Sequence, residues 1–240
     1  MKERLDKVLV DRGITSNRSQ AENYIKLGKV KVDKRVVKKP GSKTSKNAVV
    51  SLTTTKRYVS RGGFKLESVA TKLELDFQNK TVLDVGSSTG GFSDYALQHE
   101  AAKIIAVDIG TQQLAEALRT NTKIELHEQT DIKEVKMLST EINIVLIDVS
   151  FTSVRPILKH LLNLIDSNCV IVAMVKPQFE ANDSLKHKGV IKNQTIRRKI
   201  FKDFEAWVKN EYKILNKADS GIAGEKGNVE RFYLLKPLRS

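Results

Sequence analysis

The chain has 240 residues, 40% of them hydrophobic, and its 42 Lys and Arg against 28 Asp and Glu give a formal net charge of +14. This length suits one domain of ordinary size plus a small one, and the charge favours a polyanionic partner such as RNA, DNA or an acidic membrane surface. No apolar run reaches the ~18 residues of a membrane span, the first residues lack the apolar segment of a signal peptide, and the single cysteine, Cys169, excludes a disulfide framework. We therefore expect a reduced, cytoplasmic protein, and no metal site, because its four histidines are scattered.

The positive charge is concentrated near the start of the chain. Residues 1–59 hold 16 Lys and Arg against 5 Asp and Glu, which leaves a net charge of only +3 for residues 60–240. This split predicts a basic, nucleic-acid-binding domain over residues 1–59 and a nearly neutral catalytic domain over residues 60–240.

Two short helices open the chain. The spacing of Leu5, Val8 and Leu9 predicts the first helix, which ends at Gly13. The second is expected to begin after Ser16 as its N-cap and to end at Gly28.

Short strands follow these helices. Residues 29–32 alternate between charged and apolar, the period of a half-buried strand, and further strands are expected over residues 35–37 and 48–50.

Residues 3–52 resemble the alpha-L RNA-binding motif of a ribosomal protein, of pseudouridine synthases and of tyrosyl-tRNA synthetases. That resemblance implies binding to structured RNA through shape and phosphate contacts. The candidate RNA-binding residues are Arg4, Lys7, Arg18, Lys26, Lys29 and Lys31.

The stretch from Thr81 to Asp94, TVLDVGSSTGGFSD, organises the rest of the chain. An apolar run leads into a glycine cluster, which is typical of a buried parallel strand that enters a tight turn. A second apolar run, residues 104–107, ends in Asp108, where a carboxylate can hold a ribose diol. The G-x-x-x-G-G spacing differs from that of dinucleotide sites, and the acidic Asp84 suits a cationic ligand, so the pattern favours S-adenosylmethionine over a plain glycine turn. The candidate cofactor-binding residues are Asp84, Gly86, Ser87, Ser88, Thr89, Gly90, Gly91, Phe92, Asp108 and Asp131.

Apolar strands and helices alternate through the remaining residues. Further strands are expected over residues 124–127, 142–147, 169–175, 212–216 and 231–235, with helices over residues 154–165 and around residues 196–208. This alternation predicts an α/β fold with a mainly parallel sheet and helices on both faces. Because ligands bind at the carboxyl ends of such strands, the polar residues at those ends are expected on one edge. They are Asp84, Asp108, Asp131, Asp148 and Lys176.

Several strings of the chain resemble the TlyA, or hemolysin A, family of rRNA 2′-O-methyltransferases. They are YVSRGGFKL (58–66), LDVGSSTGGF (83–92), DVSF (148–151), VKPQFE (175–180) and GNVE (227–230). The resemblance implies a seven-stranded, Rossmann-like class I methyltransferase sheet of the FtsJ-like type, with S-adenosylmethionine as cofactor and rRNA or a ribosomal subunit as partner. It also places the family's Lys-Asp-Lys-Glu tetrad on Lys65, Asp148, Lys176 and Glu230, with Glu225 as a competitor for the last place.

The resemblance gives each tetrad residue a role. A ribose 2′-hydroxyl is a weak nucleophile and needs a base as it attacks a methyl carbon. Lys176 is expected to accept the proton and Asp148 to orient it, while Lys65 and Glu230 position the ribose and Lys176. Alignment of hydroxyl and methyl is expected to supply much of the rate.

Two other function classes compete with this interpretation. The family name suggests a secreted pore-forming toxin, against which the absent signal peptide and membrane segment argue, and a non-catalytic ribosome-assembly factor would keep the fold without the complete tetrad. Haemolysis by the purified protein tests the first, and cofactor titration tests the second. From the chain's extent and the resemblance we expect a cytidine of large-subunit rRNA as target, with small-subunit rRNA as a second candidate.

Overall fold

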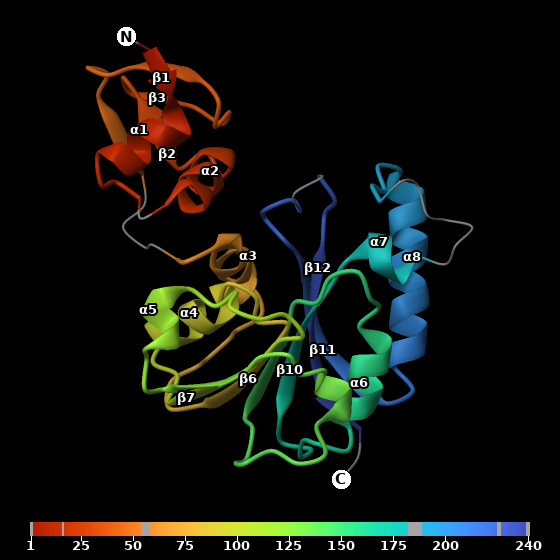
Figure 1. The fold of residues 1–240 in the computed structure, drawn as a ribbon. Coiled ribbons are helices and arrows are strands. Elements are labelled where there is room, and N and C mark those ends of the chain that lie inside the picture. Colours follow the sequence, from red (N-terminus) through yellow and green to blue (C-terminus); the bar gives the residue numbers. More distant parts are fainter. Residues whose placement is uncertain (1, 16, 54–57, 182–188, 225–226, 239–240) are drawn as a thin grey trace. The chain divides into compact units, whose positions relative to one another are not determined.

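The computed structural model describes residues 2–15, 17–53, 58–181, 189–224 and 227–238. The chain divides into two compact units, residues 1–61 and 62–240, which are described separately below (Figure 1).

The N-terminal unit combines two helices with two small antiparallel sheets. Strands β3, β2 and β5 form one sheet in that order, and β1 pairs with β4 in the other. The elements are β1 (Lys2–Arg4), α1 (Leu5–Asp11), α2 (Arg18–Lys26), β2 (Val30–Val32), β3 (Arg35–Val36), β4 (Lys43–Ser45) and β5 (Val50–Leu52).

Local sequence signals explain most of these elements. Asp33 and Lys34 both have positive φ, as a two-residue hairpin turn between β2 and β3 requires. The N-cap of α2 is Asn17, whose side chain accepts a hydrogen bond of 2.9 Å from the backbone N–H of Gln20. The predicted cap, Ser16, lies outside the described residues.

The second unit is built on a seven-stranded sheet with the order β11-β12-β10-β9-β6-β7-β8. The pairs among β8, β7, β6, β9 and β10 are parallel, and β12 runs antiparallel to both of its neighbours. The predicted, mainly parallel α/β sheet is thus confirmed. The strands are β6 (Thr81–Val85), β7 (Lys103–Val107), β8 (Ile124–His127), β9 (Ile144–Ile147), β10 (Val170–Val175), β11 (Tyr212–Asp219) and β12 (Arg231–Pro237).

Helices cover both faces of this sheet. Figure 1 shows α4 and α5 on one side of the sheet and α6 and α8 on the other. The central strands are therefore apolar on both faces, which explains their continuous hydrophobic runs. The helices are α3 (Arg61–Ala70), α4 (Gly91–Gln98), α5 (Glu116–Arg119), α6 (Arg155–Leu161), α7 (Pro177–Glu180) and α8 (Gln194–Val208), with a 3-10 helix, η1 (Ile132–Glu134).

The core on the α6 and α8 side takes alternate residues of the parallel strands. Val145 and Ile147 of β9 pack there with Leu158 of α6 and Phe204 of α8, and all four are fully buried. This packing fixes β9, β10 and α8 relative to one another and so places the loops that follow the two strands.

The strand order reverses direction at β6. From β6 the chain first moves outward through β7 and β8, and it then returns to the other side of β6 with β9 and β10. In open α/β sheets this reversal leaves a crevice outside the carboxyl ends of the strands, where ligands bind.

Candidate active site

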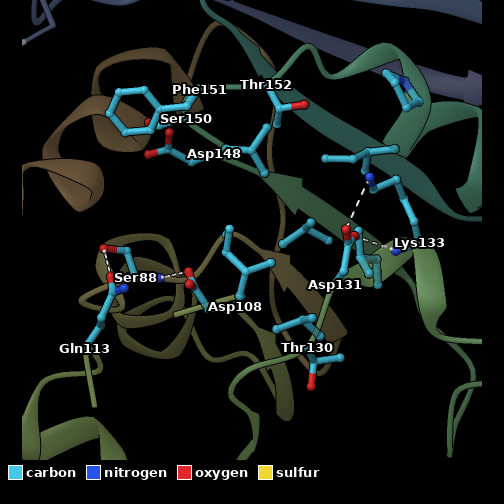
Figure 2. Close-up of a pocket in the computed structure, with 18 residues that line it drawn as sticks. Ser88, Asp108, Gln113, Thr130, Asp131, Lys133, Asp148, Ser150, Phe151 and Thr152 are labelled. Atoms are coloured by element: carbon cyan, nitrogen blue, oxygen red, sulfur yellow. Dashed lines mark hydrogen bonds and ion pairs between the residues drawn. The ribbon is translucent and has the colours of Figure 1, made fainter. Parts of the chain in front are cut away.

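A cavity of about 520 Å³ opens at this crevice. Its walls come from the carboxyl ends of β6, β7 and β9 and from the loops that follow β8 and β9 (Figure 2). Four predicted cofactor residues, Gly86, Ser88, Asp108 and Asp131, and one tetrad residue, Asp148, line it.

Gly86 brings the loop after β6 close to the loop after β9. Its φ is +79°, and a Cβ there would lie 2.8 Å from the backbone oxygen of Asp148 and 3.1 Å from a side-chain carbon of Val149. Only glycine leaves room for this close approach, so the first glycine of the motif is required for the two loops to form the cavity wall.

Asp108 ties the glycine-rich loop to the end of β7. One carboxylate oxygen accepts a 2.8 Å hydrogen bond from the backbone N–H of Ser88, and the other accepts one of 2.7 Å from that of Gly110. Ser88 is held a second time, because its hydroxyl donates to Gln113 Oε1 at 3.1 Å, as Figure 2 shows. The Asp108 carboxylate is thus fixed on the cavity wall.

Asp131 lines the cavity after β8, as the N-cap of η1. Its carboxylate accepts a 2.9 Å hydrogen bond from the backbone N–H of Lys133 and lies 3.2 Å from Lys133 Nζ. In Figure 2, Asp108 and Asp131 lie apart along the lining, and Asp148 lies across from them.

Asp84 does not reach the cavity. Its side chain is fully buried beneath the loop, where Oδ2 accepts hydrogen bonds from the backbone N–H (3.0 Å) and the hydroxyl (2.6 Å) of Ser93 on α4. Burial raises the pKa of Asp84 to about 7. The expectation that this carboxylate meets a cationic ligand directly therefore needs correction: its side chain braces α4 instead.

The other predicted loop residues also lie outside the cavity lining. The hydroxyl of Ser87 is buried and has no hydrogen-bond partner among the described residues. Gly90, with a φ of +88°, is the N-cap of α4. The residues not on the cavity wall are Asp84, Ser87, Thr89, Gly90, Gly91 and Phe92.

The four tetrad residues form two ion pairs, in which Lys65, Lys176 and Glu230 are buried and Asp148 is half-buried. Lys176 Nζ lies 2.6 Å from Asp148 Oδ1, and Lys65 Nζ lies 2.5 Å from Glu230 Oε2. Val175 and Arg231 are partners in the register of β10 and β12, so Lys176 and Glu230, one residue beyond them, lie at the same end of the sheet. The predicted tetrad is thus brought together as two neighbouring acid–base pairs, while Glu225 lies outside the described residues.

Two residues of the cavity wall, Ser150 and Phe151, follow Asp148 in the same loop. The Lys176 ammonium donates a 2.7 Å hydrogen bond to Ser150 Oγ. Phe151 is 93% exposed with a φ of +66°, and its ring centroid lies 5.5 Å from that of Phe179. Both Ser150 and Phe151 belong to the string DVSF, but the sequence predicted a role for neither, because neither ends a strand.

The predicted RNA-binding residues divide into paired and unpaired cations. Arg4 and Arg18 both bind the fully buried Asp6 carboxylate, at 2.7 and 2.9 Å, and these contacts, chiefly the hydrogen bond from Arg4, hold the pKa of Asp6 well below its usual range. Lys7 and Lys26 pair with Glu3 and Glu22, each four residues earlier in the chain.

Lys29 and Lys31 form no ion pair within the part of the chain that the structure describes. Among the six candidate residues, the two that form no ion pair are therefore those in and directly before β2.

Two further observations concern metal ligands and membrane-spanning helices. No group of three His, Cys, Asp or Glu side chains in the described ranges is arranged to bind a metal ion. None of the helices found among those residues combines the length and the apolar character needed to span a bilayer.

Comparisons with known proteins match both units. The sequence pattern of the FtsJ-like methyltransferase family matches residues 58–236, and that of the S4 domain matches residues 3–50. The chain is 40% identical over 179 residues to the 23S rRNA (cytidine-2′-O)-methyltransferase TlyA of Campylobacter jejuni, covering 73% of this chain and 70% of the relative.

Two further relatives match over nearly the whole chain. Identity to the 16S/23S rRNA (cytidine-2′-O)-methyltransferase TlyA of Mycobacterium tuberculosis is 30%, over 97% of this chain and 89% of the relative. Identity to Hemolysin A of Brachyspira hyodysenteriae is 33%, over 95% of this chain and 97% of the relative.

A comparison of structures supports the same family. The solved structure of a Streptococcus thermophilus protein that carries the name hemolysin matches with a TM-score of 0.77 and 32% identity over all of this chain and 90% of the other. The chain therefore belongs to the FtsJ-like methyltransferase family and, with its N-terminal S4 domain, to the TlyA and hemolysin A group.

Proposed function

We propose that this protein transfers a methyl group from S-adenosylmethionine to the 2′-hydroxyl of a cytidine ribose in 23S rRNA. The observation that carries the proposal is the set of two ion pairs, Lys176 with Asp148 and Lys65 with Glu230, at the end of the sheet where Gly86, Asp108 and Asp148 line a cavity.

The lining of the cavity fits S-adenosylmethionine at Asp108. This residue offers a fixed carboxylate at the end of β7, the position that holds a ribose diol in doubly wound folds. Asp131 and Asp148 also line the cavity, but Lys133 and Lys176 are their ion-pair partners. Asp108 forms no ion pair among the described residues, so its carboxylate is the one that favours a cationic, diol-bearing ligand.

The bound cofactor supplies an electrophilic methyl group, and the chain's own residues prepare the attacking oxygen. Asp148 and Ser150 hold Lys176 Nζ at 2.6 and 2.7 Å, so the direction of its nitrogen toward the site is fixed. In its neutral form this amine has the lone pair that accepts the proton of the ribose hydroxyl. Glu230 holds Lys65 in the same way, and Lys65 orients the ribose.

Phe151 provides a surface for the target base. Its exposed ring stands on the cavity wall three residues after Asp148, and its backbone has a left-handed conformation. Bases removed from a stack bind readily on aromatic side chains, so we assign Phe151 to the nucleoside whose ribose meets Lys176.

The N-terminal unit supplies affinity for rRNA in this proposal. Lys29 and Lys31, which form no ion pair among the described residues, are the proposed phosphate contacts, and the S4 match over residues 3–50 supports this. Phosphate contacts position an RNA without reading its sequence. In this proposal the N-terminal unit therefore positions the rRNA, and the methyltransferase unit completes the selection of one cytidine.

Mapping of ribose methylation across rRNA from cells with and without the gene tests the proposal. We expect one 2′-O-methylcytidine in 23S rRNA to disappear in the deletion and to return with the parent protein but not with Lys176→Ala. A second mark that disappears from 16S rRNA would extend the substrate. An unchanged ribose map, or the loss of a methyl group on a base, would refute the proposed reaction.

A further inference from the structure

Two neighbouring loops of the methyltransferase unit are joined at two places. Residues 148–155 follow β9, and residues 176–180 follow β10. The first junction is the hold of Asp148 and Ser150 on Lys176, and the second is the carboxylate of Glu180.

Glu180 binds three successive residues of the first loop. Its Oε1 accepts a 2.7 Å hydrogen bond from the backbone N–H of Val154, and its Oε2 accepts hydrogen bonds from Ser153 Oγ at 2.8 Å and Arg155 Nε at 3.2 Å. The side chain is 1% exposed. A carboxylate is tolerated in such a place only when its partners satisfy it, and truncation of one partner leaves an uncompensated buried charge.

Arg155 extends this hold to a long helix. Its Nη2 lies 2.6 Å from Asp203 Oδ2, and its guanidinium stands 5.4 Å from the ring centroid of Trp207, both on α8. The end of the first loop is therefore fastened to a rigid element and to the residues that follow Lys176.

Phe151 lies between the two junctions. Its positive φ is a costly conformation for a residue with a Cβ and persists only where the surroundings impose it. Its ring contacts Phe179, the neighbour of Glu180, so residues 176–180 touch the loop at Phe151 as well as at the two junctions.

We infer that Glu180 is a positioning residue for methyl transfer: it holds residues 153–155 so that Asp148 and Ser150 seat Lys176 and Phe151 faces the site. The inference rests on the proposed function and adds to it a buried group that touches none of the reacting atoms. Displacements of about 1 Å at a catalytic group can cost on the order of 100-fold in rate, so a loosened loop slows chemistry more than binding.

Glu180→Gln tests this inference in the full-length protein. Glutamine keeps the size of the side chain but offers one acceptor oxygen, so either Val154 N–H or the Ser153 and Arg155 donors lose theirs. We expect single-turnover methyl transfer to slow by about 10- to 100-fold, while the affinities for S-adenosylmethionine and for rRNA stay within about threefold of the parent's.

Glu205→Gln is the matched control. Glu205 is another largely buried glutamate, and its carboxylate accepts hydrogen bonds from Lys217 and Tyr233, outside the two loops. It should lower the melting temperature as Glu180→Gln does and leave the single-turnover rate unchanged.

A double-mutant cycle separates positioning from general destabilisation. If Glu180 and Ser150 both act by fixing the position of Lys176, the single-turnover rate of Glu180→Gln/Ser150→Ala falls by less than the product of the two single effects. A fall equal to that product would contradict a shared action on Lys176. Should Glu180→Gln fail to fold, Ser153→Ala removes one donor from the same carboxylate and should slow transfer a few-fold with unchanged affinities.

The outcomes distinguish this inference from the proposed function. A parent protein that transfers no methyl group overturns the proposed function and this inference with it. An active parent whose Glu180→Gln or folded Ser153→Ala variant has the parent's rate overturns the positioning role alone.

Discussion

Asp84 is a carboxyl group that the fold keeps away from water. Burial raises its pKa to about 7, so between pH 4 and 7 the folded protein holds a proton that the unfolded chain has released. Stability should therefore fall as pH rises through this window, by roughly 2 to 3 kcal/mol between pH 5 and 7. Urea unfolding of the parent and of Asp84→Asn over pH 5–8 checks this, and the variant should lack that slope.

Other acidic groups do not confuse this test. Contacts with Lys103 and His127 lower the pKa of Glu125 to about 2, and the pKa of Asp6 is also lowered, so both carboxyls contribute a constant stability above pH 5. Their contributions disappear only at lower pH. A parent and an Asp84→Asn variant with parallel pH profiles would contradict the buried, protonated state of Asp84.

Asp108 should govern the affinity for the cofactor. Both of its oxygens hold backbone N–H groups on the cavity wall, and the proposed ribose contact adds a further charge-assisted hydrogen bond. Asp108→Ala should weaken S-adenosylmethionine binding about 10- to 100-fold, because hydrogen bonds to charged groups contribute about 1.5–3 kcal/mol. Calorimetry measures this, with Asp76→Ala, an exposed aspartate that caps a turn, as control. Equal affinities of the Asp108→Ala variant and the parent would show that the carboxylate does not meet the ribose.

Residues that directly follow a strand could be predicted from the sequence. The prediction failed for residues whose place in the site depends on the direction of the side chain. Asp108, Asp148 and Lys176 directly follow apolar runs, so the parallel fold was enough to bring them to one edge. Asp84 lies one residue before the end of β6, and the alternation of a strand turns its side chain away from the cavity. Glu180 acts through contacts between two loops, which no periodic pattern records.

At the scale of elements, strand β2 should meet RNA more than the helices do. Lys29→Gln/Lys31→Gln and Lys7→Gln/Lys26→Gln each remove two positive charges, but only the second pair of lysines is ion-paired. A lysine without an ion pair can neutralise a phosphate fully and so release counterions from the RNA, whereas an ion-paired lysine is already partly neutralised by its glutamate. The Lys29→Gln/Lys31→Gln variant should therefore weaken rRNA binding more. It should also reduce the salt slope by roughly 0.7 to 0.9 for each phosphate that is no longer neutralised. Filter binding at several salt concentrations measures both slopes. Equal weakening by the two variants would show that net charge alone, and not the place of the charge, controls binding.

Long elements could be predicted from the sequence more completely than short ones. The strands of the parallel sheet have continuous apolar runs, and α8 repeats its apolar residues at helical spacing. Strand β4 has three residues with one buried side chain, too short for an alternation to be visible, and it was missed. Helix α6 was predicted to reach Ile165 but ends at Leu161. The apolar residues that suggested the longer helix continue into the turn that follows it, so the pattern alone does not mark the helix end.

At the scale of the whole molecule, the two units should have separable roles. All residues of the tetrad and of the cavity lie in residues 62–240, so a chain that begins at Thr55 should keep its affinity for S-adenosylmethionine. It should bind rRNA far more weakly, with a shallower salt slope, and lose methylation at working concentrations. Calorimetry and filter binding on the two lengths measure these effects. Equal rRNA affinities and slopes would show that the methyltransferase unit finds its RNA alone.

The transfer of labelled methyl from S-adenosylmethionine to unmodified rRNA, by the parent and by Lys176→Ala, tests the central claim most directly. In single-turnover reactions with the label located by nuclease digestion, the parent should place it on the ribose 2′-oxygen of a cytidine in 23S rRNA. Lys176→Ala should bind cofactor and rRNA within a few-fold of the parent and place no label. Label on a base, or transfer by Lys176→Ala at the parent's rate, would contradict the account.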